Sequence, residues 1–296
     1  MANAITGTTH QFSTPYLTLT EYKNAPTAID YDNLVVGGNA AAQDAELTNV
    51  IARASSWVDT YCNQILGATS ENEQQRTRVK NDGTIRFHPR YAPIIALTAL
   101  AYGSDPNNLT TVTDCSVCWL EDSQVIFPYS RLSTTWSNQG PLQFGFPSSP
   151  NVETFLRYTY INGYANTLIN TATAAATSLT VTDGTGIVAG QMLKIYDGVS
   201  SENVMVASTY TFGSTTVPLT SALAYSHSNG ISISSLPPAV KEAAILATTA
   251  FLKVRGDNSL VMAVTTRPSA APSDAQNIKG DLGLAMELLK PFRRMR

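Results

Sequence analysis

Between about Ala42 and Leu66, apolar residues recur at intervals of three and four positions. The apolar residues are Leu47, Val50, Ile51, Ala54, Trp57, Val58, Tyr61, Cys62 and Ile65. That spacing places them on one stripe of an α-helix, so the pattern predicts a packed amphipathic helix. Gly67 follows directly and is the expected residue at its C-terminal end.

Two more helices are expected near the end of the chain. Pro237-Pro238 opens a stripe spaced four-three-four-three, from Val240 to Val254, whose alanines would let a neighbouring helix come close. After a Pro/Ala/Ser linker at about 265–273, a last helix is expected at about 274–289, capped by Ser273 and stopped at Pro291. Its apolar side comprises Ile278, Leu282, Ala285, Leu288 and Leu289.

The segments between these helices favour strands and turns. Strands are expected at 91–102 (a buried one), 116–120, 124–127 and 154–161, with a long loop at 128–151. Residues 1–40 predict an extended arm, with one possible helical turn at 17–22.

Residues 165–234, here called the β-module, hold few charges, many Thr and Ser, and regular turn signals. Strands are expected at 178–182, 192–196, 203–211, 215–220 and 231–234. Weak self-similarity relates Ser178–Tyr196 to Thr216–Ser234. The pattern indicates an inserted all-β module, either a small sandwich or a barrel.

Together these elements predict an α+β fold: a helical core with a β-hairpin and a short sheet, an inserted all-β module and a C-terminal helix. The expected divisions are an arm at 1–40, a core at 41–164 and 235–262, the β-module at 165–234, and a linker with a helix at 263–296.

One face of the expected hairpin is entirely basic. Side chains two apart share a face of a strand, and this face carries Arg76, Arg78, Lys80, Arg86, His88 and Arg90. A loop of Asn81-Asp82-Gly83, with Gly83 left-handed, would pair Val79 with Ile85 and Arg78 with Arg86. Like charges opposite each other are destabilising, so this basic face is expected to meet something acidic, either a partner protein or a phosphate backbone. The alternative is a solvated face eased by carboxylates such as Glu71 and Glu73.

Composition limits the possible functions. Charged residues make up 14% of the chain and the net charge is −3, which argues against a general nucleic-acid binder. Weakly charged surfaces suit a subunit that buries much of itself in an assembly, although extracellular β proteins look similar. With no signal peptide or membrane span expected, the odd set Cys62, Cys115 and Cys118 indicates a reducing cytoplasm.

The sequence offers no recognisable active site. Cys115-Ser-Val-Cys118 lacks the further ligands of a zinc site, and His10, His88 and His227 have no metal-ligand spacing. No nucleophile elbow, phosphate loop or dinucleotide fingerprint is present. We therefore expect no catalytic residue, metal or cofactor, and a protein that is not an enzyme.

Three stretches carry a family resemblance. They are Ala45–Cys62, the hairpin motif Arg76-x-Arg78-Val79 with Asp82-Gly83 and Pro89, and Leu236–Asp257. Their order resembles head-to-tail adaptor (connector) proteins of long-tailed bacteriophages. The resemblance covers roughly residues 40–103 and 235–262, and the β-module goes beyond that family's minimal helical core.

The resemblance implies a structural protein of the virion neck, assembled in the host cytoplasm. Members form a ring of about twelve subunits under the portal protein, extend the DNA channel and meet a tail or further connector protein. It also implies that the basic face meets DNA non-specifically or an acidic protein, with a slight preference for protein. The C-terminal helix and its tip would dock on the portal, through Ile278, Leu282, Leu288, Leu289, Lys290, Phe292, Arg293, Arg294 and Arg296. The alternative is an ordinary C-terminal helix whose cations complement the helix dipole.

Two other functions stay open. A carbohydrate- or surface-binding module is suggested by the Thr/Ser-rich β-module with Tyr196, Tyr210 and Tyr225. A hydrolase would need a role for His88 or His227.

Overall fold

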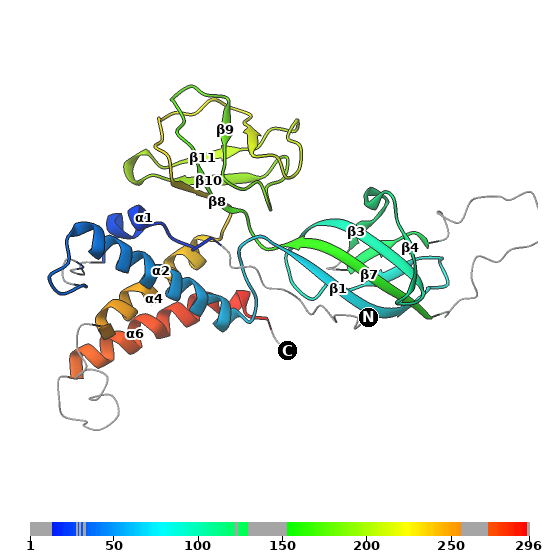
Figure 1. Ribbon diagram of the computed structural model, residues 1–296, viewed down its shortest axis with the longest axis horizontal. Coiled ribbons are helices and arrows are strands. Elements are labelled where there is room, and N and C mark those ends of the chain that lie inside the picture. Colours follow the sequence, from blue (N-terminus) through cyan, green and yellow to red (C-terminus); the bar gives the residue numbers. More distant parts are fainter. Residues whose placement is uncertain are drawn as a thin grey trace, which may run out of the picture. The chain divides into compact units, whose positions relative to one another are not determined.

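The computed structural model describes residues 14–27, 29, 31, 34–121, 124–129, 153–255 and 272–294, with backbone only for 254–255 and 272–279. The chain mixes helices with antiparallel sheets, which confirms the α+β class (Figure 1). It forms two compact units: a sheet unit that contains Thr69–Gly163, and a helical unit that contains the segments on either side, including the β-module. This differs from the expected core at 41–164, because the sheets bury an apolar cluster of their own.

The helical unit contains α1 (Leu19–Asn24), α2 (Ala40–Cys62), α4 (Pro238–Arg255), α6 (Pro272–Leu289) and the short 3-10 helix η3 (Lys290–Phe292). The Asn39 side chain caps α2 by accepting the N–H of Ala42 at 3.0 Å. The helix ends at Asn63, which adopts the left-handed conformation with φ 55°. The expectation that Gly67 ends this helix was wrong, because asparagine also tolerates that conformation.

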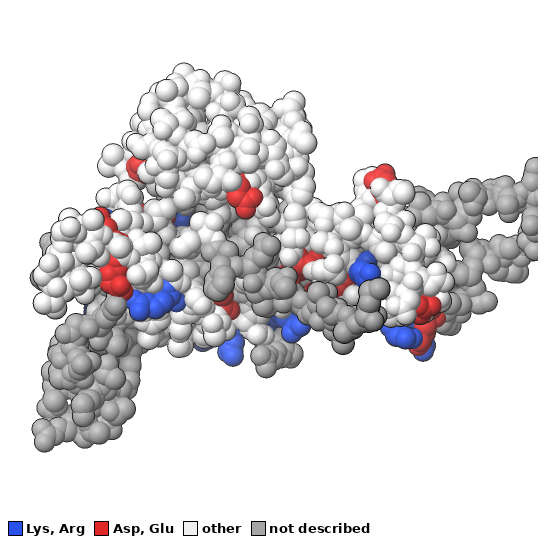
Figure 2. Space-filling view, in the orientation of Figure 1, with Lys and Arg blue, Asp and Glu red and all other residues white. Residues whose placement is uncertain are grey.

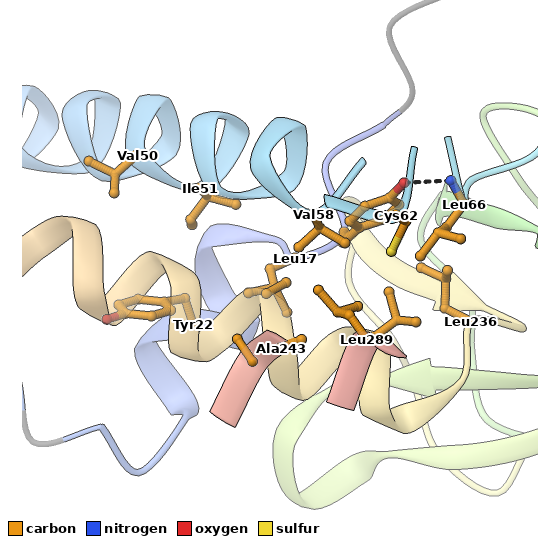
Figure 3. Close-up of a cluster of buried hydrophobic side chains, with 14 of the residues drawn as sticks. Leu17, Tyr22, Val50, Ile51, Val58, Cys62, Leu66, Leu236, Ala243 and Leu289 are labelled. Atoms are coloured by element: carbon orange, nitrogen blue, oxygen red, sulfur yellow. Dashed lines mark hydrogen bonds between the residues drawn. The ribbon is translucent and has the colours of Figure 1, made fainter. Parts of the chain in front are cut away.

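The core of the helical unit lies where α2, α4 and α6 pack together (Figure 3). It includes Leu47, Val50, Ile51 and Val58 from α2, Val240, Ala243 and Ala244 from α4, and Ala285 and Leu289 from α6. The buried alanines of α4 have short side chains, so α2 and α6 can both pack closely against this helix. The predicted stripes are therefore core faces, and each fully buried leucine contributes about 1.5–3 kcal/mol.

The β-module folds around a separate apolar cluster. Its strands are β8 (Asn166–Ile169), β9 (Ser178–Thr180), β10 (Met192–Tyr196), β11 (Glu202–Met205), β12 (Thr216–Pro218) and β13 (Ile231–Ser234). Four of them form an antiparallel sheet in the order β11-β10-β13-β8, and β9 pairs with β12. The sequence missed β8, and β11 is shorter than the expected strand at 203–211.

The self-similarity of the β-module has a structural counterpart. Leu179 lies opposite Val217, and Ile195 lies opposite Ile233, in two antiparallel pairings. The partners of each pair are equivalent positions of the two repeats, since 179 and 217 are separated by the same number of residues as 195 and 233. When equivalent positions of two repeats pair antiparallel, a local two-fold axis relates them. The pairing is therefore consistent with two copies of one structural motif in the β-module.

The sheet unit contains β1 (Thr69–Arg78), β2 (Ile85–Phe87), β3 (Ile94–Asp105), β4 (Asn108–Thr111), the 3-10 turn η1 (Cys115–Val117), β5 (Trp119–Glu121), β6 (Gln124–Phe127) and β7 (Glu153–Asn162). The strand orders are β1-β7-β3-β4 and β2-β6-β5. The strand expected to be buried at 91–102 corresponds to β3, which is mostly half-exposed. The linker at 265–273 and nearly all of the loop at 128–151 lie outside the described residues.

Candidate interaction surface

The turn of the hairpin follows the predicted register at its tip. Val79 is bridged to Ile85, the N–H of Lys80 donates to the Thr84 carbonyl at 2.8 Å, and Gly83 has φ +73°. A three-residue loop that ends in a left-handed glycine produces this pattern. Val79, Ile85 and Phe87 are at most 1% exposed, as that register requires.

Beyond the tip, the predicted pairing of Arg78 with Arg86 was wrong. Arg78 lies opposite Glu153 of β7, and Arg86 lies opposite Ile126 of β6. Strand β1 pairs with β7 over its whole length, so the two arms of the hairpin separate into different sheets. This arrangement removes the opposition of like charges that the simple hairpin would impose.

All six residues of the basic face are exposed, and three have acidic partners. Glu153 lies 3.8 Å from the Arg76 guanidinium and 3.3 Å from that of Arg78, and Asp82 lies 3.0 Å from that of Arg86. Lys80 and His88 form no ion pair with any residue that the structure describes. The face is therefore neutralised only in part, and its remaining charge is available to a partner.

The carboxylates expected to ease this face serve another purpose. Glu73 accepts hydrogen bonds from the hydroxyls of Tyr158 (2.9 Å) and Tyr160 (2.7 Å) and from the N–H of Arg90 (3.1 Å). These hydrogen bonds hold the segment after β2 against the sheet β1-β7-β3-β4. Burial, followed by the charge of Glu73, raises the pKa of Glu71 to about 7.

The sequence missed one further cation on this surface. Arg157 of β7 lies opposite Gln74 of β1, and residues directly opposite in an antiparallel pair point to the same side. Gln74 shares its side of β1 with Arg76 and Arg78, so Arg157 extends the basic face onto β7. Only the register of β1 on β7 could have revealed this.

The C-terminal helix differs from the expected docking peptide. Leu289 is fully buried in the core of the helical unit, and Leu288 and Phe292 pack against that core. The side-chain amide of Gln64 donates to the Phe292 carbonyl at 3.0 Å, and the N–H of Arg294 donates to the Cys62 carbonyl at 2.9 Å. The assignment of Leu289 to portal docking is therefore corrected, because the chain itself covers it, whereas Leu288 and Phe292 remain partly exposed.

The rest of the predicted docking set divides into two groups. Leu282 is half-buried, whereas Lys290 and Arg293 are exposed. Lys290 pairs with Glu287 at 2.6 Å, and the Arg293 guanidinium lies 5.4 Å from the centre of the Tyr61 ring. The Ile278 side chain and Arg296 lie outside the described residues.

A buried polar cluster in the β-module was not predicted from the sequence. The His227 side chain is fully buried, with Nδ1 2.8 Å from Asp197 and Nε2 2.9 Å from Glu202. Imidazole donates from both nitrogens only when it is protonated. Burial acts to raise the pKa of Glu202, but hydrogen bonds from the Ala224 N–H, His227 and the Tyr225 N–H outweigh burial and lower it. The cluster ties the loop that holds His227 to the two ends of the β10–β11 connection, and the full burial of the ring argues against a catalytic role for His227.

The tyrosines that suggested glycan binding are mostly engaged elsewhere. Tyr210 is buried and donates to the Ser214 carbonyl at 2.8 Å. The Tyr196 ring lies under the Lys241 ammonium at 4.3 Å, and Tyr225 is 47% exposed. The side of the β-module seen in Figure 2 is almost uncharged. It presents no row of exposed tyrosines among the described residues.

Two charged groups of the helical unit are shielded from water, Lys241 almost fully and Asp59 in part. Lys241 is 5% exposed and donates to Glu21 at 2.7 Å and to Ser232 at 3.1 Å. Burial lowers the pKa of Lys241, although Glu21 opposes this. Asp59 accepts from the Tyr16 hydroxyl, and burial raises the pKa of Asp59 to about 6. These interactions hold the chain segments together and do not form a cleft with free reactive groups.

The thiols are poorly suited to chemistry. Burial raises the pKa of both Cys62 and Cys118 to about 12, so both stay protonated at neutral pH. Within the described ranges, no group of three His, Cys, Asp or Glu side chains is arranged to hold a metal. None of the helices seen there combines the length and apolar character needed to cross a bilayer.

Comparison with protein-family models, curated proteins and solved structures finds no match to this chain.

Proposed function

We propose that this chain is a head-to-tail adaptor of a bacteriophage virion. It forms a ring of about twelve subunits under the portal, extends the DNA channel and joins the head to a tail or further connector protein. The ring is assembled in the host cytoplasm and resides in the virion neck. The chain performs no catalytic reaction.

The observation that carries this proposal is the contact between the two helical segments among the three adaptor-like stretches. Ala45–Cys62 lies in α2 and Leu236–Asp257 includes α4, and their apolar faces share one core although the β-module and the sheets separate them in sequence. The rings of Trp57 of α2 and Phe251 of α4 stand nearly perpendicular, with their centroids 6.5 Å apart. Such a core makes these two segments one helical body. The β-module is an addition to it, and the third adaptor-like stretch, the hairpin, lies in the sheet unit.

The basic face contributes a band of positive charge to the ring. A ring repeats each exposed cation around its axis and multiplies its electrostatic effect. Glu153 and Asp82 already occupy three of the arginines, which weakens attraction to a phosphate backbone. The face therefore suits an acidic protein and only loose, non-specific contact with passing DNA.

The portal contact is carried by the exposed cations at the C-terminus. Since Leu289 holds the end of α6 in the core, Lys290 and Arg293 are displayed on a fixed site beside Tyr61. Arginine stacked on an aromatic ring is well placed to meet a carboxylate of a partner. Truncation of the helix would expose the core, so charge reversal is the sharper way to test this contact.

The test is the mass of the complex formed when this chain is mixed with the portal ring from the same source. We expect a gain of about twelve times the 31.7 kDa subunit mass, measured by native mass spectrometry. The double variant Lys290→Glu with Arg293→Glu should lose the gain, and the charge-preserving control Lys290→Arg with Arg293→Lys should keep it. No gain with the wild-type chain at high concentration would reject the proposal, and equal gains for both variants would reject only the assigned portal contact.

A further inference from the structure

Strand β5 stands out in the sheet unit because it exposes large apolar side chains. It is the edge strand of the sheet β2-β6-β5, and all three of its residues are exposed. Trp119 is 44% exposed and Leu120 is 53% exposed. Next to them, Glu121 adds a carboxylate that forms no ion pair in the part of the chain that the structure describes.

An exposed apolar edge strand is normally avoided in a protein that acts alone. Natural sheets blunt such edges with lysine, proline, bulges or covering segments, because a free edge accepts another chain. Trp119 and Leu120 do the opposite, since they add large exposed side chains to the two faces of the sheet at this edge. Tryptophan in particular is enriched among residues that dominate binding energy at protein interfaces.

The opposite side of the same small sheet carries the complementary charge. Strand β2, at the other edge, bears Arg86, and β1 joins it through the Val79–Ile85 bridge and a hydrogen bond from the Thr77 hydroxyl to the Arg86 carbonyl (3.0 Å). The basic face of Arg76, Arg78, Lys80, Arg86, His88 and Arg90 therefore lies along the β1/β2 side. One copy thus presents an apolar, acidic edge and a basic side at opposite ends of one sheet.

We propose that β5 of one copy packs against the basic β1/β2 side of a second copy. This contact is heterologous, since two different surfaces meet, and repeated heterologous contacts close into a ring when the rotation allows it. The inference rests on the proposed function, because it names the surfaces by which the adaptor subunits meet. Unlike a two-fold contact, it leaves an open chain of copies with one unpaired surface at each end until the ring closes.

The chemistry of the two surfaces fits such a contact. The indole of Trp119 is the best ring for stacking under a guanidinium, and the basic side offers Arg76, Arg78 and Arg86. Glu121 can pair with a cation that has no acidic partner among the described residues, such as Lys80. Leu120 can cover the aliphatic stems of the arginines and lysine, which are apolar up to their charged ends.

Disulfide trapping tests the contact directly. The variant carries Glu121→Cys and Arg86→Cys in a background with Cys115→Ser and Cys118→Ser, and the two single-cysteine variants are the matched controls. Two strand spacings separate β5 from β2, about 10 Å, which is too far for a disulfide within one copy. We expect a covalent ladder on non-reducing gels for the double variant, and at most dimers for each control alone.

The trapping is done twice, with concentrated protein alone and with the portal ring added. A ladder in either condition supports the contact, and its absence in both overturns it. If the portal complex gains the expected mass while no ladder forms, this contact is wrong and the adaptor function stands. If a ladder forms in free protein while no portal complex is found, the contact stands and the adaptor function fails.

Substitution of the edge gives a second, independent readout. Trp119→Ser with Leu120→Ser places polar groups at positions that are already exposed, so folding should not suffer. We expect self-association to weaken about thirtyfold or more in sedimentation equilibrium. The same exchange at the exposed Val199 of the β-module, Val199→Ser, is the control and should change nothing. Equal association of both variants would contradict the proposal.

Discussion

The β-module and the sheet unit are both antiparallel, yet they treat charge in opposite ways. The β-module has only four charged residues, and two of them, Asp197 and Glu202, contact the buried side chain of His227. The sheet unit places Arg76, Arg78 and other cations on exposed strand positions, with fewer carboxylates than cations around them.

The comparison distinguishes charged groups that the fold requires to remain paired from charged groups that are exposed and can bind a partner. A buried ionic cluster contributes little net stability, but the loss of one member leaves the others uncompensated. Exposed pairs contribute at most about 1 kcal/mol, so a fold can place or remove them at little cost. Substitution of a charged residue should therefore mainly change stability in the β-module and mainly change association in the sheet unit.

The largest expected effect is the loss of the buried imidazole. His227→Ala leaves two carboxylates close together without the group that both contact, and we expect a loss of about 3 kcal/mol in the free energy of unfolding. Urea unfolding measures it. The control is His88→Ala on the exposed basic face, which should stay within about 0.5 kcal/mol of wild type. Similar losses for both variants would remove the distinction drawn between the two regions.

A smaller effect concerns the pH dependence of stability. Burial raises the pKa of Asp59 to about 6 in the helical unit and that of Glu71 to about 7 in the sheet unit, from ordinary values of 3.8 and 4.5. Because each folded pKa lies above the unfolded one, the stabilisation is complete at acidic pH and is lost as the pH rises through these windows.

Asp59→Asn and Glu71→Gln should remove that dependence. Relative to the variants, wild type should lose up to about 3 kcal/mol for each carboxyl group, between about pH 4 and 6 for Asp59 and between about pH 4.5 and 7 for Glu71. Thermal or urea unfolding across this range measures the difference. A wild-type stability that rises relative to the variants over these windows would show that the carboxylates are stabilised in their charged form.

The smallest effect on stability is expected at the basic face. Glu153→Gln removes the carboxylate shared by Arg76 and Arg78, which should change stability by less than about 0.5 kcal/mol. It should nevertheless raise the salt concentration needed to elute the protein from heparin, because two guanidiniums become available. Glu46→Gln, which releases Arg53 on α2, is the matched control, and an equal shift for it would show that the basic face is no special site for anions.

Part of this architecture could be read from the sequence because the interactions concerned are local. The stripe from Leu47 to Cys62 predicted α2, since i, i+3 and i+4 positions share one face whatever they pack against. The turn at Gly83 was predictable for the same reason, because its register depends on a few neighbouring residues. The end of α2 was missed, since both Asn63 and Gly67 can adopt the left-handed conformation.

Long-range pairings could not be read in this way. Alternation along β1 showed which side chains share a side, but not that β7 would lie beside it and bring Arg157 and Glu153 to the basic face. Likewise, Asp197 and Glu202 flank the β10–β11 connection while His227 lies in a later loop, and no spacing in the sequence shows that the three meet. The apolar side of α6 suited either an external partner or the chain's own core.

The sequence by itself determined the helices, the tip of the hairpin and the duplicated pattern of the β-module, because short-range sterics and periodic burial decide these. The tertiary structure decided that the two arms of the hairpin join different sheets, that Leu289 is buried within the chain, and that Trp119 lies on an edge strand of the described sheet β2-β6-β5. Many segments could satisfy the same alternation or the same apolar stripe. The choice among them depends on which set of partners buries the most apolar surface while pairing every strand and charge at once.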